Sequence, residues 1–465
     1  MTRAIGLVLL APLAGFALEA ALGAGEFRLH ARAWGTTLVV AGGAAALALL
    51  LGIPTGLALA HTRRSVFRTL TILPLLLPPV LAAAAWLGAR LPIPGAAGCG
   101  VLLGALYWPV VALLLDASLR RLPADAIDAA EIHLTPSRML RVVVWPHVRP
   151  AILSAALLVF LLAASEFTVP ALFIVPTISM TIYEEMSAFR TASAASAAIP
   201  LFALAVGLAF ALRRIPMIPP AKPARPFLNG APLAGVRSMA GVVWLTAIAP
   251  AAIFASRAGS FFRTISMNVD AILWSGAIAG ATALLLVAWG SLSPRRSRLE
   301  PLWLATLALP GVVAGFGALQ VARHTSLLPL LGPSGALLVL ALMARFAFAA
   351  WLPLREPVDL RQLEAAELSG LSPVRIWWRI TAPALLPRAA AAGAIVFVLA
   401  LGEIGPVVLL SPPGRLTASQ HLFNLMHYGY DEVVASIALL LFGATALVTW
   451  SGMHVGRLRT NRLAA

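Results

Sequence analysis

Long apolar runs alternate with short polar segments along the whole chain. In the first half the runs fill residues 4–24, 34–60, 69–89, 99–119, 150–175 and 193–212. In the second half they fill residues 238–256, 268–290, 301–322, 333–354, 387–411 and 433–453. About 20 apolar residues cross the ~30 Å hydrocarbon core as a helix, whereas an open strand edge would leave backbone groups without partners there. The pattern therefore predicts an all-α polytopic membrane protein with about 12 transmembrane helices.

A proline-rich segment separates the two halves. Residues 213–237 combine several prolines with Lys222 and Arg225, a composition that keeps a linker extended and in water. Because each half holds an even number of predicted spans, both halves run the same way through the membrane, as in a parallel duplication. We therefore expect a first transmembrane repeat over residues 1–225 and a second over residues 226–465.

The positions of arginine predict the orientation. Basic residues gather in alternate loops and at the C-terminus, namely Arg63, Arg64, Arg68, Arg120, Arg121, Arg138, Arg141, Arg213, Arg214, Arg295, Arg296, Arg298, Arg457, Arg459 and Arg462. The opposite loops, such as residues 92–98 and 325–332, are short and carry little net charge. By the positive-inside rule the basic segments are cytoplasmic, which puts both termini and the two polar segments around residues 122–150 and 359–387 on the inside.

The first apolar run has a second interpretation. Residues 4–22 follow Arg3 and end in small residues, which also fits a secretory signal. Removing this run would leave the first half one span short of the second. We therefore expect an uncleaved helix.

Composition and charge narrow the classes of partner. The chain of 465 residues is 60% hydrophobic and 11% charged, with a mean hydropathy of +0.91, which places it in a lipid bilayer. A net charge of +16 would suggest nucleic acid if it lay on one soluble face, but these basic residues fall in short segments between apolar runs. No nucleic-acid partner is expected. The single cysteine, Cys99, provides neither a disulfide within the chain nor a thiolate metal cluster.

A polar hairpin lies between two apolar runs of the second half. Residues 364–373 read Glu-Ala-Ala-Glu-Leu-Ser-Gly-Leu-Ser-Pro and are followed by Trp377, Pro383 and Pro387. The pattern indicates a short amphipathic helix, a turn at Gly370, and a second short helix. We expect the alanines to let a partner approach closely, Gly370 to supply a turn that a side chain would obstruct, and Trp377 to anchor the hairpin.

The first half holds a second, altered copy. Residues 128–136 read Asp-Ala-Ala-Glu-Ile-His-Leu-Thr-Pro, and three prolines in this region each precede their counterparts by 237 positions: Pro136, Pro146 and Pro150 against Pro373, Pro383 and Pro387. This copy has no glycine, and its acid lies one residue closer to the first proline. The other interpretation of either copy is an ordinary interfacial helix pair held by anionic headgroups.

This spacing resembles the cytoplasmic coupling loop of ATP-binding-cassette (ABC) importer permeases, and two copies on one chain resemble the fused permeases of iron(III) and thiamine importers. The resemblance implies a bacterial plasma (inner) membrane subunit, a path between the halves, a dimer of separate ATPase subunits that grips both hairpins, and an extracytoplasmic solute-binding protein. It implies coupling loops over residues 122–150 and 359–387, with contacts at Asp128, Ala129, Ala130, Pro136, Pro146, Glu364, Ala365, Ala366, Gly370, Pro373, Trp377 and Pro383. The cargo would be iron(III), thiamine or another small cationic solute.

Two acids lie inside the predicted spans. Glu166 and Glu403 share the 237-residue offset, and each lies 16 residues after the last proline of its hairpin, or ~24 Å along a helix. Pro170 and Pro406 are expected to interrupt the helices just beyond. Carboxylates at this depth indicate either a transport path that attracts a cation or a structural clamp bonded to neighbouring backbone. Both interpretations stay open.

Arg345 has no basic counterpart, since Trp108 stands 237 positions earlier. We expect it to pack against carbonyl groups rather than to form one side of an ion pair. His421 and His427 lie six residues apart, which is not the spacing of a helical ligand pair, so no metal site is expected.

The chain lacks a G-x-x-x-x-G-K-[ST] phosphate loop and any catalytic arrangement, so we expect a transport subunit without a cofactor, with ATP hydrolysis on a separate chain. The alternative is a secondary transporter of the major-facilitator kind, which also has two parallel six-span halves. That class concentrates charge after spans two and eight. Arg63, Arg64, Arg295 and Arg296 do lie there, but without the expected glycine and aspartate pattern.

Overall fold

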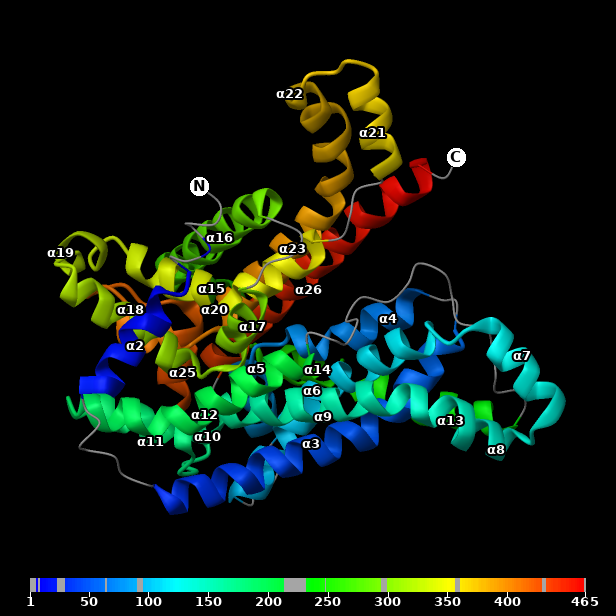
Figure 1. Cartoon of the computed structure of the whole chain (residues 1–465). Coiled ribbons are helices and arrows are strands. Elements are labelled where there is room, and N and C mark those ends of the chain that lie inside the picture. The colour runs from blue at the N-terminus through cyan, green and yellow to red at the C-terminus, as the bar shows by residue number, and fades with distance from the viewer. Residues whose placement is uncertain are drawn as a thin grey trace. The chain divides into compact units, whose positions relative to one another are not determined.

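A computed structural model of the chain describes residues 6, 9–22, 30–62, 65–89, 95–212, 231–246, 248–293, 299–355, 360–428 and 432–463. These residues form helices and connecting turns, and no strand occurs among them (Figure 1). The predicted all-α class is therefore confirmed. The predicted linker lies outside the described residues from position 213 to position 230, as do the basic residues at positions 63, 64, 295, 296 and 298. Residues 231–237 belong to the helix α13 (Ala231–Thr246), so the expectation that the extended linker continues to residue 237 is wrong.

The first half runs from α2 to α12. Its helices are α2 (Ala11–Leu22), α3 (Ala31–Ala60), α4 (Ser65–Ile72), η2 (Pro74–Leu76), α5 (Pro79–Gly88), α6 (Gly95–Leu119), α7 (Ala124–His133), α8 (Pro136–Met139), η3 (Leu140–Val144), α9 (Trp145–Ser165), α10 (Thr168–Leu172), α11 (Ile178–Ser187) and α12 (Thr191–Leu212).

The second half runs from α13 to α26. Its helices are α13 (Ala231–Thr246), α14 (Ala249–Arg257), α15 (Phe261–Met267), α16 (Val269–Leu292), α17 (Glu300–Ala308), α18 (Gly311–His324), α19 (Leu328–Leu331), α20 (Ala336–Leu354), α21 (Leu360–Leu368), α22 (Pro373–Ile376), η4 (Trp377–Thr381), α23 (Ala382–Gly402), α24 (Gly405–Leu410), α25 (Ala418–Met426) and α26 (Glu432–Leu463).

Many of these helices suit a bilayer. Among the described residues, eight helices are long and apolar enough to cross a membrane, and ten spans result when each of two bent pairs is taken as one. A shorter apolar helix covers Thr191–Gly207. The chain is thus a multi-pass membrane protein, while the count of 12 spans stays a prediction.

Two predicted spans, residues 69–89 and 301–322, are broken rather than continuous. The first bends by 89° between Val66–Leu76 and Pro79–Gly88, and the second by 115° between Glu300–Leu307 and Gly311–His324. Pro78 and Pro310 stand at the breaks with extended backbone as the N-caps of α5 and α18. A proline has no N–H to donate to the preceding turn, so each helix ends there and a new one starts.

The helices fall into two compact units, and each unit is discontinuous in sequence. Unit 1 comprises residues 1–25, 262–422 and 440–465, and unit 2 comprises residues 26–261 and 423–439. The N-terminal helix α2 therefore belongs with helices of the second half, while α13 and α14 belong with helices of the first half. The two predicted repeats, residues 1–225 and 226–465, are duplicated stretches of sequence and not these two packed units. Their boundary stays a prediction.

In unit 1, α2 packs closely on α18 through two glycines. A Cβ atom on Gly15 would overlap the Gly317 carbonyl, and a Cβ atom on Gly317 would overlap the Pro12 carbonyl. Small residues let membrane helices approach until their backbones touch. Whether the first apolar run is cleaved stays a prediction.

In unit 2, α3 and α6 pack extensively against each other, and glycines again let the two helices approach closely. A Cβ atom on Gly52 would come within 2.5 Å of Val111, and one on Gly104 within 2.8 Å of Leu47. The helix α13 packs against α3, and Trp244 on α13 donates a hydrogen bond to Thr71 on α4 over 2.7 Å. These contacts hold the base from which the first hairpin projects.

The two halves repeat the same series of elements at an offset of 237. From α8 to α9, the bounds 136–139, 140–144 and 145–165 become 373–376, 377–381 and 382–402 in α22, η4 and α23. Both η3 and η4 are π-helical turns, in which the N–H groups of Trp145 and Ala382 bond to carbonyls five residues earlier. Each turn ends two residues before the following proline, whose ring would otherwise clash with a carbonyl of the preceding turn. The internal repeat is therefore present in the backbone as well as in the sequence.

Candidate functional site

The first candidate element is hairpin 1, residues 122–150. The helix α7 ends at His133, and Leu134 turns the chain with extended backbone at φ −125°. Pro136 then starts α8. This turn needs no left-handed residue, which explains why a copy without glycine, and one residue shorter, still forms a hairpin.

Hairpin 2, residues 359–387, uses a different turn. Gly370 has φ +72°, and the N–H of Leu371 bonds to the Ala366 carbonyl to close the end of α21. No atom lies within 4 Å of a Cβ built on Gly370. A side chain at this position would thus be strained by the left-handed backbone itself rather than by a neighbouring atom, which is why glycine suits the turn.

Each hairpin buries one alanine and exposes the other. Ala130 and Ala366 are 5% and 6% exposed, whereas Ala129 and Ala365 face outward. In hairpin 1, Ala130 packs in an apolar cluster with Ile127, Met139 and Val144. The first alanine of each pair is thus available to a partner, and the second holds the hairpin together.

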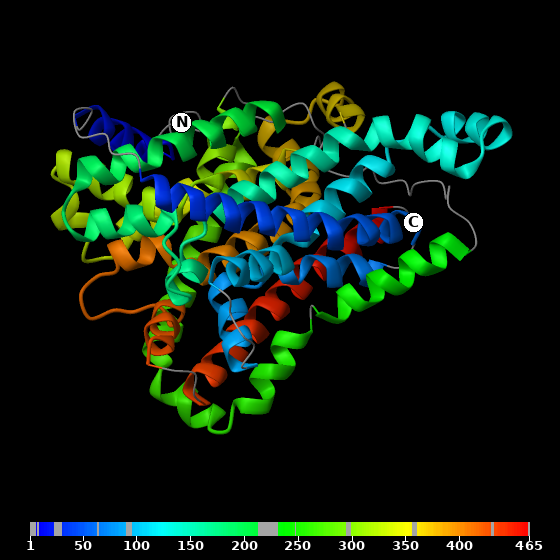
Figure 2. The same cartoon turned by 90° about the horizontal axis from the view of Figure 1, so that it is seen from below.

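Both hairpins also present a large apolar side chain beside the exposed alanine. Ile132 is 76% exposed and Leu368 is 90% exposed, and each lies three residues after its exposed alanine. Both hairpins extend beyond the helices that carry them (Figures 1 and 2). A repeated combination of a small residue and an exposed apolar side chain is typical of a surface that another protein covers.

The remaining predicted coupling residues divide between surface and interior. Asp128 and Trp377 are half-buried, and Glu364 is exposed. Trp378 is 69% exposed, so it is the tryptophan at the surface of hairpin 2. The prolines lie at the helix starts, with Pro136, Pro146 and Pro373 exposed and Pro383 half-buried.

An ion-pair cluster secures the base of hairpin 1. Asp116, near the end of α6, accepts a hydrogen bond from Arg120 over 2.8 Å and pairs with Arg68 of α4 over 3.4 Å. Arg120 also donates to the Leu59 carbonyl at the end of α3. Because Asp116 is only 2% exposed, the two arginines supply the charge that its burial requires.

A simpler pair occupies the same place in unit 1. Arg355 follows α20 and donates to Glu300, in the first turn of α17, over 2.5 Å. Its guanidinium lies 5.2 Å from the ring of Trp351. In both halves, therefore, the helix that leads into the hairpin is bound to the half-helix that precedes a break.

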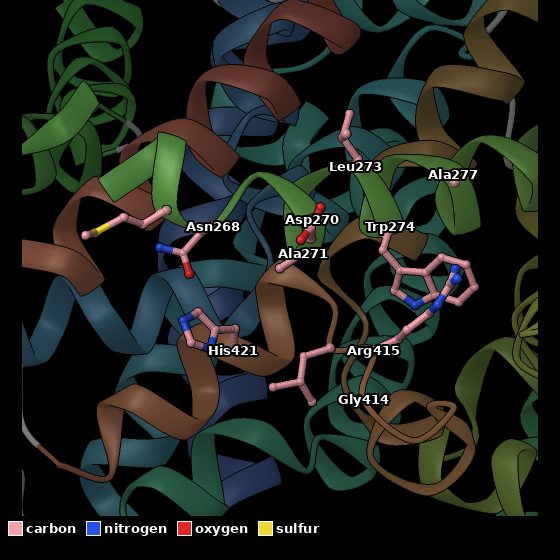
Figure 3. Close-up of a pocket in the computed structure, with 11 residues that line it drawn as sticks. Asn268, Asp270, Ala271, Leu273, Trp274, Ala277, Gly414, Arg415 and His421 are labelled. Carbon is pink, nitrogen blue, oxygen red and sulfur yellow. The ribbon is translucent and has the colours of Figure 1, made fainter. Parts of the chain in front are cut away.

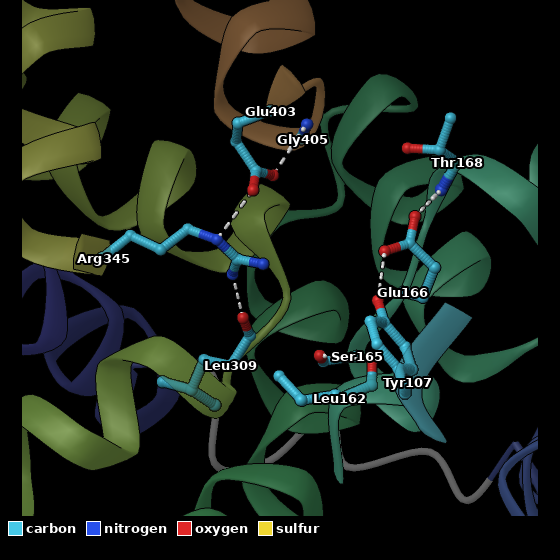
Figure 4. A network of polar contacts seen from close by, with 9 residues as sticks. All are labelled: Tyr107, Leu162, Ser165, Glu166, Thr168, Leu309, Arg345, Glu403 and Gly405. Carbon is cyan, nitrogen blue, oxygen red and sulfur yellow. Dashed lines mark hydrogen bonds and ion pairs between the residues drawn. The ribbon is translucent and has the colours of Figure 1, made fainter. Parts of the chain in front are cut away.

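The second candidate element is the pair of acids at the ends of α9 and α23 (Figure 4). Glu166 is the C-cap of α9, and its carboxylate accepts hydrogen bonds from the Thr168 N–H over 2.8 Å and from the Tyr107 hydroxyl over 3.4 Å. Its carbonyl accepts a bond from Ser179. The helix therefore breaks at the acid itself, not at Pro170, which lies inside α10.

Glu403 caps α23 in the same way but adds a charged partner (Figure 4). One oxygen accepts the Gly405 N–H over 3.2 Å, and the other accepts from Arg345 over 2.9 Å. Arg345 also donates to the carbonyl of Leu309, at the end of α17. The helix breaks at Glu403 rather than at Pro406, and Arg345 forms an ion pair as well as a carbonyl contact, so the expectation of packing alone is wrong.

The sequence contained partial signals for this network. Two dipeptides mark the two breaks, Pro-Pro at positions 78–79 and Pro-Gly at positions 310–311, and both are sequence signals for a helix end. Tyr107 and Leu309 carry no signal, because a tyrosine and a leucine in an apolar run are ordinary core residues. Their roles depend on helix packing.

These features define a polytopic helical membrane protein with two related halves, discontinuous helices and paired polar hairpins. No family model matches the chain. It is 29% identical over 193 residues to the putative 2-aminoethylphosphonate transport system permease protein PhnV of Salmonella paratyphi A, a match that covers 38% of this chain and 71% of that protein.

A second relative has the same general role. The chain is 27% identical over 85 residues to the putrescine transport system permease protein PotI of Escherichia coli K12, covering 18% of this chain and 30% of that protein. Both relatives are permease components of transport systems. The comparison supports a transport permease, a non-enzymatic subunit, as the class of this protein.

Proposed function

We propose that this chain is the transmembrane subunit of an ATP-driven importer of the ABC class, with two fused permease halves in the bacterial inner membrane. Both termini and both hairpins face the cytoplasm in this proposal. A dimer of separate ATPase subunits binds the hairpins, and an extracytoplasmic solute-binding protein delivers the cargo.

The repeated exposed face of the hairpins carries this proposal. Ala129 with Ile132, and Ala365 with Leu368, recur at equivalent places on two segments that the positive-inside rule puts on one side of the membrane. A partner with two equivalent subunits would find one such face on each half. A secondary transporter has no need of this doubled surface.

In this proposal transport proceeds by alternating access, in which the path opens to one side of the membrane at a time. Closure of the ATPase pair on nucleotide would draw the hairpins together and open the path outward, and hydrolysis would reverse the change. The ion pairs Asp116–Arg68 and Glu300–Arg355 would pass the movement from the hairpin bases to the broken helices. The shift cannot exceed the difference in binding free energy that nucleotide and delivery protein provide between the two states.

The cargo of this proposal is a small solute with a cationic group. Glu166 and Glu403 lie at helix breaks, where discontinuous membrane helices commonly form solute sites. Putrescine and 2-aminoethylphosphonate, which the names of the relatives contain, both carry an amine. Iron(III) and thiamine belong to the same cationic class.

Two adjacent alanines provide the test. Ala365→Arg adds a long charged side chain to the exposed face of hairpin 2, so it should abolish co-purification of the ATPase while the permease stays folded. Ala366→Arg places the same side chain in the interior and should unfold the hairpin. The measurement is mass spectrometry of proteins purified with the tagged full chain, together with ATP-dependent uptake into proteoliposomes.

Leu330→Arg, in the predicted opposite loop where Leu330 is 71% exposed, is the control and should retain the ATPase. The proposal fails if the wild-type chain recovers no ATPase, or if uptake persists without ATP and stops when the ion gradient is removed. It also fails if Ala365→Arg binds the ATPase as the wild-type chain does.

A further inference from the structure

Unit 1 contains a cavity that the coupling mechanism does not use (Figure 3). Its volume is about 750 Å³, within the range of small-molecule sites. Residues from the start of α16 form one wall, and the loop between α24 and α25, with the first turn of α25, forms the other. On the predicted topology this is the extracytoplasmic end of the unit.

Two opposite charges line this cavity without neutralising each other. Asp270 lies in the first turn of α16, and Arg415 lies in the opposite loop. Within the part of the chain that the structure describes, no hydrogen bond or ion pair joins the Asp270 carboxylate or the Arg415 guanidinium to another side chain. Both groups are therefore available to a ligand.

Trp274 fixes the position of the cationic group. The Arg415 guanidinium lies 4.7 Å from the centre of the Trp274 ring. This cation–π contact occupies the face of the guanidinium and leaves the N–H groups at its edge free to donate. An edge of parallel N–H donors suits the oxygens of a carboxylate or phosphate.

The other polar groups of the cavity are neutral. His421 lies in the wall, and burial lowers the pKa of its imidazole, which keeps it uncharged at neutral pH. Asn268 adds an amide whose nitrogen donates to the Thr264 carbonyl. The lining thus carries one negative and one positive charge. A simple cation would meet the repulsion of Arg415, and a simple anion that of Asp270.

We propose that this cavity binds a zwitterion that carries an ammonium group and a phosphate-type oxyanion, with Asp270 accepting from the ammonium and Arg415 donating to the oxyanion. Two sources share this chemistry. One is the headgroup of a zwitterionic phospholipid, and the other is a free solute on the extracytoplasmic side. The proposal does not depend on the ABC assignment.

The first test uses three probes on the purified full chain in maltoside detergent. Phosphoethanolamine carries both charges, whereas ethanolamine and inorganic phosphate carry one kind each. Calorimetric titration should show saturable binding of phosphoethanolamine that is roughly tenfold tighter than that of either single-charge probe, because each charge-assisted hydrogen bond adds a factor of this order. Equal affinity for all three, or no binding of phosphoethanolamine, overturns the proposal.

Substitutions then locate the site. Asp270→Asn and Arg415→Gln should each weaken phosphoethanolamine binding by about tenfold. Arg323→Gln is the matched control, because Arg323 is an exposed arginine at the end of α18 that does not line the cavity. Unchanged binding in both cavity variants, in protein that is as monodisperse as the control, contradicts the assignment.

Nanodiscs distinguish the two sources. In discs of phosphatidylethanolamine a lipid headgroup would already occupy the cavity, so binding of soluble phosphoethanolamine should be weaker than in discs of phosphatidylglycerol. Equal binding in the two kinds of disc would assign the cavity to a free solute. Either result supports the zwitterion site, and absence of binding in both discs refutes it.

Discussion

Arg345 connects three helices through one side chain. It projects from α20, binds the Leu309 carbonyl at the end of α17, and pairs with Glu403 at the end of α23 (Figure 4). Both acceptors lie at helix C-termini, where unpaired carbonyls carry partial negative charge. A single cation therefore serves two helix ends that have no continuing turn.

Removing the positive charge of Arg345 should lower the stability of unit 1. We expect Arg345→Gln to destabilise unit 1 by about 3 kcal/mol, because the Glu403 carboxylate is then buried without its charged partner. The double variant Arg345→Gln with Glu403→Gln should recover at least half of that loss, since no buried charge remains. Chemical unfolding followed by fluorescence measures both. Equal losses in the single and double variants would refute this account.

Glu185 provides a pH-dependent contact outside the spanning helices. Hydrogen bonds from Arg190 are the main cause that lowers the pKa of Glu185 below its ordinary value of 4.5. The contribution of this carboxylate to stability is therefore complete above pH 4.5 and is lost as pH falls through the lowered pKa. It holds the end of α11 to the start of α12.

Proteolysis at acid pH tests whether the Glu185–Arg190 pair holds α11 to α12. We expect pepsin to cut the wild-type segment between α11 and α12 faster as the pH falls from about 4.5 to about 3. Arg190→Gln should be cut at the faster rate over the whole range, because its Glu185 has lost the partner that depends on ionisation. Parallel pH profiles for the two proteins would show that the pair does not control this segment.

Residue-level expectations from the sequence succeeded where spacing was decisive. The offset of 237 identified Glu166 and Glu403 as equivalent, and the structure gives both the same capping role. The sequence did not distinguish exposed Ala365 from buried Ala366, because two adjacent alanines on a helix differ only in the direction that tertiary packing sets. The contacts of Glu166 with Tyr107 and of Glu403 with Arg345 were not predicted either, because they depend on how the helices pack.

At the scale of elements, the broken helices are the main departure from a simple bundle. The sequence pattern predicted continuous spans over residues 69–89 and 301–322, because both runs are long enough and lack charged residues for most of their length, although each contains a proline at its break. Hydropathy reports the length of an apolar run, not the direction of its backbone. The half-helices α4 and α17 are consequently short, and polar contacts attach them to α6 and α20.

A charge exchange tests the attachment of α17. We expect Glu300→Arg to lower ATP-dependent uptake, because two arginines then face each other at the start of α17. The exchange Glu300→Arg with Arg355→Glu should restore most uptake, since the pair is re-formed with reversed sign. Uptake in proteoliposomes, normalised to ATP hydrolysed, is the measurement. A double variant no better than the single one would mean that the pair has no such role.

At the scale of the whole molecule, neither half of the sequence contains a complete unit. The helix α2 lies in unit 1 with residues 262–422, and α13 and α14 lie in unit 2 with residues 26–212. The contact of Gly15 with Gly317 and the bond from Trp244 to Thr71 are two of the ties within these units. Each half thus depends on a helix that the other half supplies.

Splitting the chain should expose this dependence. We expect residues 1–225 or 226–465 expressed alone to be degraded or aggregated, because each leaves an apolar helix surface without its partner. Co-expression of the two fragments should restore a stable complex that purifies through a tag on either one. Size-exclusion chromatography after detergent extraction measures the outcome. Stable, monodisperse single fragments would contradict the exchange of helices.

The π-helical turns η3 and η4 bear on the history of the chain. The same extra residue in a helical turn occurs at the same place in both halves, next to Pro146 and Pro383, although most side chains around it differ. Two independent insertions at one equivalent position are far less economical than one insertion followed by gene duplication. We therefore infer that the bulge arose once, before the duplication that produced the two halves, and that differences such as Arg345 in place of Trp108 came later.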